Sequence, residues 1–242
     1  MDDPPVDAVV GLHLWNDLSA GTIALRPGPA FATMDEIAIT IEGQGGHGGV
    51  PHLAVDPIVA AAHTITALQT IVSRETPPLE AAVVTVGTIN AGTAFNIIPD
   101  RVEMRGTVRT FTNEVRARTL RRIEEIVTGT ASTLRARATL TARFGCPAVR
   151  NDPSVTDLVR QVAVSAVGQD RVVEMQPTTG SDDMAYFLER APGCYFLVGS
   201  ANAEARLDGR HHSARFDFDE EALIAAAKVL GGAAVRLLEP TA

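Results

Sequence analysis

Six histidines are the side chains of this 242-residue chain whose ionisation lies nearest to neutral pH. His13 falls in the apolar run 7–14, where a buried ring nitrogen needs a hydrogen-bond partner, a metal or a substrate. His211 and His212 are adjacent in a polar segment that precedes the last predicted helix. Taken alone, these residues are more typical of a core histidine bonded to backbone and of a solvated surface pair. By themselves they indicate two metal ligands only weakly.

His47 has more distinctive neighbours, because four glycines surround it between residues 45 and 49. Glycine permits positive φ and lets the backbone approach another group closely. The loop leads to Asp56 and Pro57, which predict the N-cap and the first turn of a helix. A histidine presented by glycines ahead of a helix N-terminus is suited to stabilising a developing negative charge. The alternative is a flexible loop without chemistry.

The signatures of several other hydrolase and metal-binding classes are missing from the chain. It contains no HExxH, CxxC or GxSxG, so the zincin, zinc-ribbon and serine-hydrolase interpretations lose their main support. Its two cysteines, Cys146 and Cys194, are far apart and have no metal-like spacing. We expect both to be buried thiols.

The charge balance bears on partners and location. The 21 basic and 29 acidic residues give a net charge of −8, which argues against nucleic acid as a partner. Residues 101–150 alone contain 11 Arg and 4 Glu, a pattern typical of a solvated face. No segment approaches the roughly 20 apolar residues that span a bilayer, so we expect no membrane partner. The start, residues 1–5, has neither a basic nor an apolar signal-peptide region, so we expect a cytoplasmic protein.

The segment that carries His47 has the periodicities of a sheet covered by two helices. Strands are predicted at 37–42, 81–89, 102–109 and 139–144, and helices at 57–72 and 113–134. The order is β-α-β followed by β-α-β. Because each strand has one apolar face and each helix one apolar stripe, a four-stranded ferredoxin-like sheet can bury all of them.

The residues on either side of this segment have another α/β pattern. Strands are predicted at 7–14, 22–25, 172–175 and 194–198, and helices at 153–166, 181–190 and 219–238. Since these outer pieces are too small to stand as separate domains, we predict that they form one α/β domain. That domain comprises residues 1–33 and 147–242 and is interrupted by residues 34–146.

Six motifs, in this order, give the chain a resemblance to a known family. They are Gly11–Trp15, Gly45–His52, Ala94–Asp100, Gly106–Arg109, Gly180–Phe187 and His212–Phe216. The chain resembles the metal-dependent amidohydrolases of the aminoacylase and carboxypeptidase superfamily. Within it, the chain is most similar to the hippurate hydrolase and indole-acetyl-amino-acid hydrolase branch. The resemblance covers nearly the whole chain.

The resemblance implies a fold and a reaction. Residues 1–33 and 147–242 would be part of a zinc-peptidase-like α/β catalytic domain, and residues 34–146 an inserted ferredoxin-like βαββαβ lid that also forms a homodimer. In such enzymes a metal-bound water, deprotonated by a glutamate, attacks the amide carbonyl of an N-acyl amino acid. Two divalent metals (zinc, manganese or cobalt) serve each site.

The resemblance also implies roles for particular residues. His13 and His212 match the terminal ligands, one for each metal. His47 matches the lid histidine that reaches the partner subunit's site and polarises the scissile carbonyl. His52 belongs to the same motif, but no role is carried over to it. The remaining matches hold the substrate carboxylate or line the substrate pocket, and they are Asn96, Arg109, Gly180 and Ser181.

The chain also departs from the family pattern. The family's cysteine, His-Asp pair and Glu-Glu pair, which supply the bridging ligand, further ligands and the general base, have no match here. Asp182 and Met184 replace the family's Glu and Phe in the Gly180 motif. We therefore expect a truncated amidohydrolase that is inactive alone. The alternatives are a catalytically inactive dimerisation or ligand-binding protein derived from the family, and a general peptidase of the same superfamily.

Overall fold

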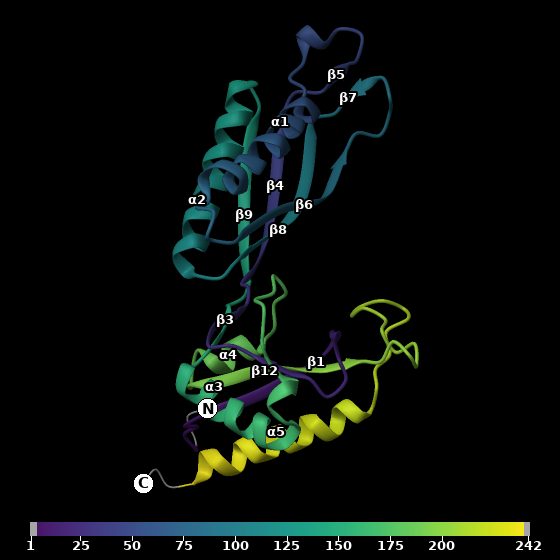
Figure 1. Ribbon diagram of the computed structural model, residues 1–242. Helices are drawn as coiled ribbons and strands as arrows, with labels where there is room; N and C mark the ends of the chain where they lie inside the picture. Colours follow the sequence, from purple (N-terminus) through teal and green to yellow (C-terminus); the bar gives the residue numbers. More distant parts are fainter. Residues whose placement is uncertain (1–3, 240–242) are drawn as a thin grey trace. The chain divides into compact units, whose positions relative to one another are not determined.

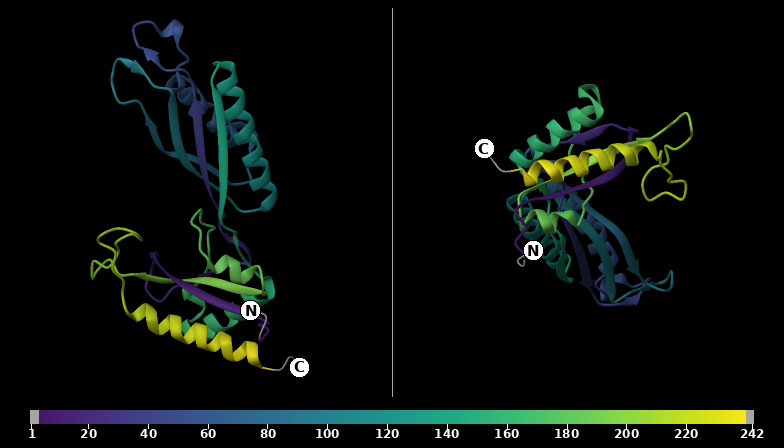
Figure 2. Two further views of the ribbon diagram at one scale, coloured as in Figure 1. Left: turned by 180° about the vertical axis from the view of Figure 1, so that it is seen from behind. Right: turned by 90° about the horizontal axis from the view of Figure 1, so that it is seen from below.

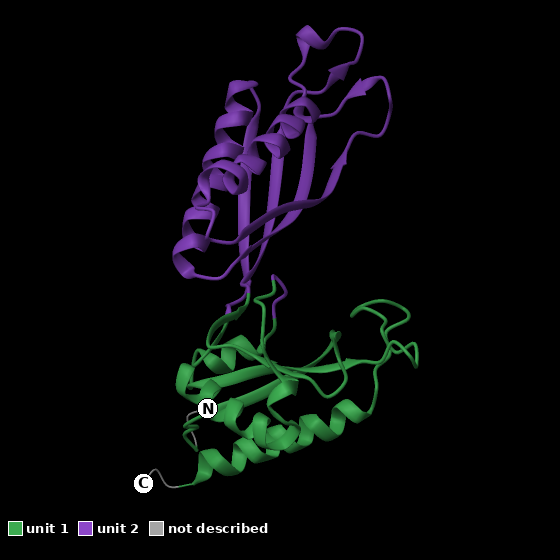
Figure 3. Cartoon of the chain, viewed as in Figure 1, with its two compact units in different colours: residues 1–31, 149–178, 182–242 green, residues 32–148, 179–181 purple. Residues whose placement is uncertain are grey.

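Two four-stranded β-sheets organise the chain in the computed structural model, which describes residues 4–239. One compact unit comprises residues 1–31, 149–178 and 182–242, and the other comprises residues 32–148 and 179–181 (Figure 3). We call these the discontinuous unit and the inserted unit. Residues 1–3, part of the segment in which no signal peptide is expected, lie outside the described residues.

The inserted unit is a four-stranded antiparallel sheet with two helices on one face (Figures 1 and 2). Its strand order is β6-β8-β4-β9. The strands are β4 (Met34–Glu42), β6 (Ala82–Ala91), β8 (Arg101–Thr110) and β9 (Arg137–Cys146), and the helices are α1 (Pro57–Thr70) and α2 (Asn113–Thr133). A π-helical turn, Ile71–Glu75, continues α1.

Local sequence explains these elements. Ile37, Ile39 and Ile41 alternate along β4 and are at most 1% exposed, so they fix the face that packs on the helices. The Asp56 side chain accepts hydrogen bonds from the backbone N–H groups of Ile58 and Val59 and caps α1. Thr112 caps α2 in the same way through the Val115 N–H.

A second, two-stranded sheet lies in the inserted unit. β5 (Gly46–His47) pairs antiparallel with β7 (Ile97–Ile98), so the glycine loop and the 92–100 loop are joined by backbone hydrogen bonds. A short 3-10 turn, Pro51–Leu53, follows β5. Asn96 directly precedes β7, so this pairing brings the backbone of His47 next to the segment that contains Asn96.

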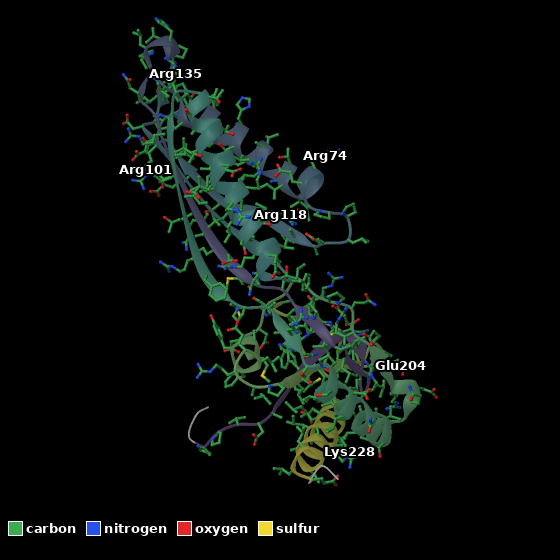
Figure 4. The ribbon with its side chains drawn as sticks, turned by 90° about the vertical axis from the view of Figure 1, so that its left-hand side faces the viewer. Arg74, Arg101, Arg118, Arg135, Glu204 and Lys228 are labelled. Carbon is green, nitrogen blue, oxygen red and sulfur yellow. The ribbon has the colours of Figure 1, made fainter. Side chains whose placement is uncertain are left out.

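The arginines of residues 101–150 lie mostly at the surface of the inserted unit. Arg118 pairs with Glu80, Arg101 with Glu103, and Arg122 with both Glu75 and Glu125. Figure 4 shows Arg101 and Arg118 among the outer side chains. Exposed pairs of this kind contribute little to stability, and the expected solvated face is confirmed.

The discontinuous unit is a mixed sheet with the strand order β1-β12-β2-β11. β1 is parallel to β12, β12 is antiparallel to β2, and β2 is parallel to β11. The strands are β1 (Val9–Ser19), β2 (Ile23–Leu25), β11 (Val172–Glu174) and β12 (Gly193–Ala201). The helices are α3 (Pro153–Val167), α4 (Met184–Leu188) and α5 (Glu221–Leu238), and β3 (Gly28–Phe31) pairs with β10 (Val149–Asn151).

The two faces of β1 differ. Val10, Leu12 and Leu14 pack with the buried residues of α3 and α5. By the period of two, Gly11, His13 and Trp15 lie on the opposite face. His13 is therefore on the side of the sheet away from these two helices.

The mixed α/β fold expected from the sequence is confirmed, with local differences. The helix predicted over 181–190 spans only Met184–Leu188, because the Asp182 carboxylate accepts the Met184 N–H and forms a turn before it. Strands β3, β5, β7 and β10 were not predicted. Across residues 4–239, no helix is long and apolar enough to cross a membrane.

Candidate active site

The middle of β1 carries a cluster of aromatic rings in the discontinuous unit. The His13 ring centroid lies 5.8 Å from that of Trp15 and 5.3 Å from that of His211. His211 in turn lies 5.0 Å from Trp15 and 4.9 Å from Phe216. Residues almost 200 positions apart in sequence therefore meet beside β1. The expectation from the predicted strand 7–14 that His13 lies near the end of its strand is wrong, because β1 continues to Ser19.

His13 has one ring nitrogen engaged. Its Nδ1 donates to the Leu14 backbone carbonyl at 2.5 Å. The neutral ring then has an unprotonated Nε2 that can accept a proton or bind a metal. A backbone bond at one nitrogen is both the ordinary arrangement of a core histidine and the arrangement that orients a ligand histidine.

His211, whose role the sequence left open, is the other ring of the pair next to His13. Its Nε2 accepts the backbone N–H of Asn16 at 3.1 Å. Burial and the neighbouring His13 lower the pKa of His211, so the neutral ring is favoured. The sequence signal for this contact was weak, because nothing local distinguishes the first histidine of the pair from the second.

His212 is exposed, and its backbone has φ of 62°, which is the left-handed region. It follows directly after the ring that contacts His13. Its assignment as a metal ligand stays a prediction.

Whether these residues fit a metal centre depends on the number and type of ligand side chains that they bring together. Catalytic zinc sites use three protein ligands and one water. Among residues 4–239, no group of three or more His, Cys, Asp or Glu side chains is placed to hold a metal ion. The described residues therefore do not fit a complete metal centre on their own.

In the inserted unit, backbone contacts hold His47 and its glycine loop. The Gly49 N–H donates to His47 Nδ1 at 2.9 Å. In the neutral ring this leaves the proton on Nε2, on an exposed side chain that can donate to a carbonyl oxygen. Gly48 donates to the Asn96 carbonyl at 2.9 Å, and a Cβ at Gly48 would lie 2.9 Å from that oxygen, so the loop requires glycine here.

Arg109 and Ser181, predicted to serve the same pocket, are in contact within the inserted unit. Arg109 Nη1 donates to the Ser181 hydroxyl at 2.8 Å, and Nε donates to Thr107 at 3.1 Å. The Gly180 carbonyl accepts the Ala32 N–H, which fixes the segment that presents Ser181. Asn96 lies in the 92–100 loop with an exposed side chain.

Asp182 and Met184, the two positions that differ from the family pattern, contact the discontinuous unit's sheet. The Tyr195 hydroxyl donates to Asp182 Oδ2 at 2.9 Å. A Cβ at Gly11 would lie 3.1 Å from Met184 Sδ, so the methionine occupies the space over that glycine. His52 and His63 are exposed.

The two cysteines remain free thiols. Both are buried and form no disulfide. Burial raises the pKa of the Cys194 thiol to about 12, so the reactive thiolate is scarce.

Comparisons with known proteins bear on the family and the fold of the chain. Residues 34–133 match the M20 peptidase dimerisation domain. The chain is 41% identical over 236 residues to the N-acetyl-L-cysteine deacetylase of Bacillus subtilis (strain 168), which covers 97% of this chain and 55% of that protein. It is 36% identical over 238 residues to the IAA-amino acid hydrolase ILR1-like 4 of Arabidopsis thaliana, covering 96% of this chain and 54% of the relative.

A solved structure gives the same result for the fold. A dinuclear metal binding peptidase of the M20 family from Bacillus subtilis superposes with a TM-score of 0.79 at 32% identity, over 98% of this chain and 58% of that one. The chain thus spans between half and two thirds of the length of these proteins. Residues 34–133 therefore belong to the M20 peptidase dimerisation domain family, and the chain is homologous over nearly all of its own length to M20-family hydrolases.

Proposed function

We propose that this chain contributes the lid and part of the catalytic domain of an amidohydrolase that releases amino acids from N-acyl amino acids. The observation that carries the proposal is the 41% identity to the Bacillus subtilis N-acetyl-L-cysteine deacetylase over 97% of the chain. The six motifs that contain the proposed site residues all lie within the chain.

Arg109 and Asn96 are proposed to bind the substrate carboxylate. A guanidinium has five N–H donors, and Arg109 uses Nε and one donor of Nη1 for Thr107 and Ser181. One N–H on Nη1 and both on Nη2 remain, and a carboxylate can accept two parallel bonds from these two nitrogens. Ser181 and Gly180 would line the same pocket, because their segment holds the guanidinium in place.

His47 is proposed to donate to the scissile carbonyl oxygen in the active site of a partner subunit. Its Nε2–H is exposed, and the Gly49 N–H at Nδ1 maintains this tautomer. Exposed apolar residues near this loop support burial against a second copy. Leu53, Phe95 and Ile97 are 67%, 103% and 56% exposed.

His13 and His212 are proposed as one ligand each of a divalent metal pair. Two histidines without a bridging carboxylate would hold metal weakly, so the 242-residue chain alone should not hydrolyse substrate. A cytoplasmic location is part of the same proposal, and its support is that Cys146 and Cys194 are both buried thiols.

The competing function is a catalytically inactive dimerisation or ligand-binding protein derived from the same family. Its support is that the described part of the chain holds no group of three metal-ligating side chains. The two functions differ in whether completing the catalytic domain creates an enzyme.

The experiment joins this chain to the part of the Bacillus subtilis deacetylase that it does not match. Release of free amine from N-acetyl-L-cysteine is measured with Zn²⁺, Mn²⁺ or Co²⁺, and N-acetylcysteamine, which lacks the carboxylate, serves as the control substrate. We expect turnover of the first substrate only, and none in a His13→Ala control. A folded, dimeric completed protein without activity would favour the competing function. Turnover by the 242-residue chain above its own His13→Ala variant would contradict the proposed inactivity.

A further inference from the structure

The loop between β12 and α5, residues 202–218, is held in a conformation that its sequence does not favour. Arg206 and His212 have φ of 62°, and they are two of the three non-glycine residues with positive φ among residues 4–239. Such conformations persist only where the surrounding structure imposes them. Contacts with the rest of the discontinuous unit must therefore hold this loop in place.

One buried side chain, Asn16, ties the loop to β1. Its Nδ2 donates to the Gly209 carbonyl at 2.9 Å and to the Asp217 carbonyl at 2.6 Å, so it joins both arms of the loop. Its Oδ1 accepts from the Ser200 hydroxyl on β12. Asn16 is 6% exposed, and its side-chain amide makes a bond through both Nδ2 hydrogens and through Oδ1.

The backbone of the same residue fixes His211. The Asn16 N–H donates to His211 Nε2, so the neutral ring carries its proton on Nδ1. The ring also packs against Trp15 and Phe216. His211 is thus engaged at Nε2 and packed on its faces, whereas the next residue, His212, is exposed.

The close approach of the two loop arms has a sequence requirement. A Cβ at Gly209 would lie 2.2 Å from the Arg215 carbonyl oxygen, a distance that real Cβ atoms do not show. The carbonyl of that glycine is one of the two that Asn16 binds. The loop closure and the Asn16 bonds therefore depend on each other.

We propose that Asn16 is a positioning residue that clasps the 202–218 loop, locks His211 as a packed ring beside His13, and thereby sets where His212 stands. The consequence for catalysis rests on the proposed function, but the clasp itself does not. Asn16 lies outside the six motifs. By holding His211 in the aromatic cluster, it leaves His212 as the exposed histidine of the pair.

Two variants of Asn16 and one matched control test the clasp in the full 242-residue chain. Asn16→Ala removes the side-chain bonds, and Asn16→Asp keeps the shape but turns an acceptor toward two carbonyl oxygens. Asn151→Ala is the control, because Asn151 is 1% exposed in the same unit and bonds Arg26 and Tyr195 but not the loop. Amide hydrogen exchange of residues 203–216 is compared with that of α5.

We expect both Asn16 variants to accelerate exchange in the loop about tenfold or more relative to α5, since two or three hydrogen bonds are lost. Asn151→Ala should leave that ratio unchanged even if it destabilises the unit. Trp15, the single tryptophan, should shift its emission to the red only in the Asn16 variants. If those variants do not fold, Ser200→Ala, which removes one bond, should give a smaller acceleration of the same loop.

The tautomer of His211 supplies a measurement that a general loss of stability would not move. Asn16→Ala keeps the backbone N–H, but release of the loop should carry the His211 ring away from it. Imidazole ¹⁵N chemical shifts should therefore show the Nδ1–H form in the wild type and the commoner Nε2–H form in Asn16→Ala. An unchanged loop-to-α5 exchange ratio in Asn16→Ala, or an unchanged His211 tautomer, would overturn the proposal. None of these readouts uses substrate, so a failure of the clasp is distinguishable from a failure of the proposed function.

Discussion

Replacing Arg116 with Met should destabilise the inserted unit far more than replacing a neighbouring surface arginine. Arg116 on α2 donates through Nε and Nη2 to the two carboxylate oxygens of Asp35 on β4, at 2.7 and 2.6 Å. The Asp35 side chain is 0% exposed, and the guanidinium also lies 4.4 Å from the centroid of the Phe144 ring. The hydrogen bonds that Arg116 donates to Asp35 raise the pKa of Arg116, so the guanidinium keeps its charge.

The size of the destabilisation follows from the unpaired carboxylate that the substitution leaves. Arg116→Met would leave a buried carboxylate without its partner, which costs roughly 3–5 kcal/mol. The control is Arg105→Met, because Arg105 pairs with Glu36 on the same sheet but is 67% exposed. Loss of an exposed pair costs about 0–1 kcal/mol.

Hydrogen exchange of the β4 amides measures both losses within the inserted unit. We expect Arg116→Met to accelerate exchange at Ile37, Ile39 and Ile41 by roughly 10²–10³-fold. Arg105→Met should accelerate it by less than about tenfold. An Asp35→Leu/Arg116→Met double variant should recover much of the loss, since it leaves no unpaired charge. Equal effects of the two single variants would refute the reasoning.

Three further predictions concern the helix cap, the aromatic cluster and the substrate site. Asp56→Ala should destabilise the inserted unit by about 1 kcal/mol, measured by urea unfolding, because two N–H groups of α1 lose their acceptor. Because burial lowers the pKa of His211, its contribution to stability should be complete above pH 6.5 and be lost as pH falls below that value. The loss of unfolding free energy at low pH, followed by Trp15 fluorescence, should be smaller in His211→Asn than in the wild type. Equal losses in the two proteins would contradict a neutral, buried His211. In the completed protein, Arg109→Lys should raise KM for N-acetyl-L-cysteine by about tenfold or more, since the planar fork is lost; an unchanged KM would exclude the carboxylate role.

The periodic elements of the fold could be predicted from the sequence for a physical reason. The alternation of Ile37, Ile39 and Ile41 and the capping pair Asp56–Pro57 are local signals, and both appear where they were expected. The glycine loop around His47 was also recognisable, because close backbone approach requires glycine at Gly48. Each of these features is encoded within a few residues.

The contacts between distant segments were not predictable in the same way. No local feature of Asn16 indicates that it binds Gly209 and Asp217, because the pairing depends on β1 lying parallel to β12. The contact of His211 with His13 depends on the same strand register. The ordered resemblance of the motifs supplied the expected roles of His13 and His212, which periodicity alone could not.

Under the proposed function, this chain is part of an amidohydrolase whose His47 acts across a dimer. In the completed protein, His47→Ala should reduce kcat for N-acetyl-L-cysteine by about 10²–10³-fold, as for other donors to a developing oxyanion. His212→Ala should be inactive through its own metal site.

The most direct test mixes these two inactive proteins under conditions in which subunits exchange. Each heterodimer then contains one site with an intact His212 and a His47 from its partner. At equal mixing, about one quarter of the wild-type activity should return, because half of the dimers are mixed and each has one working site. Exchange demonstrated by mass spectrometry with no return of activity would contradict the claim.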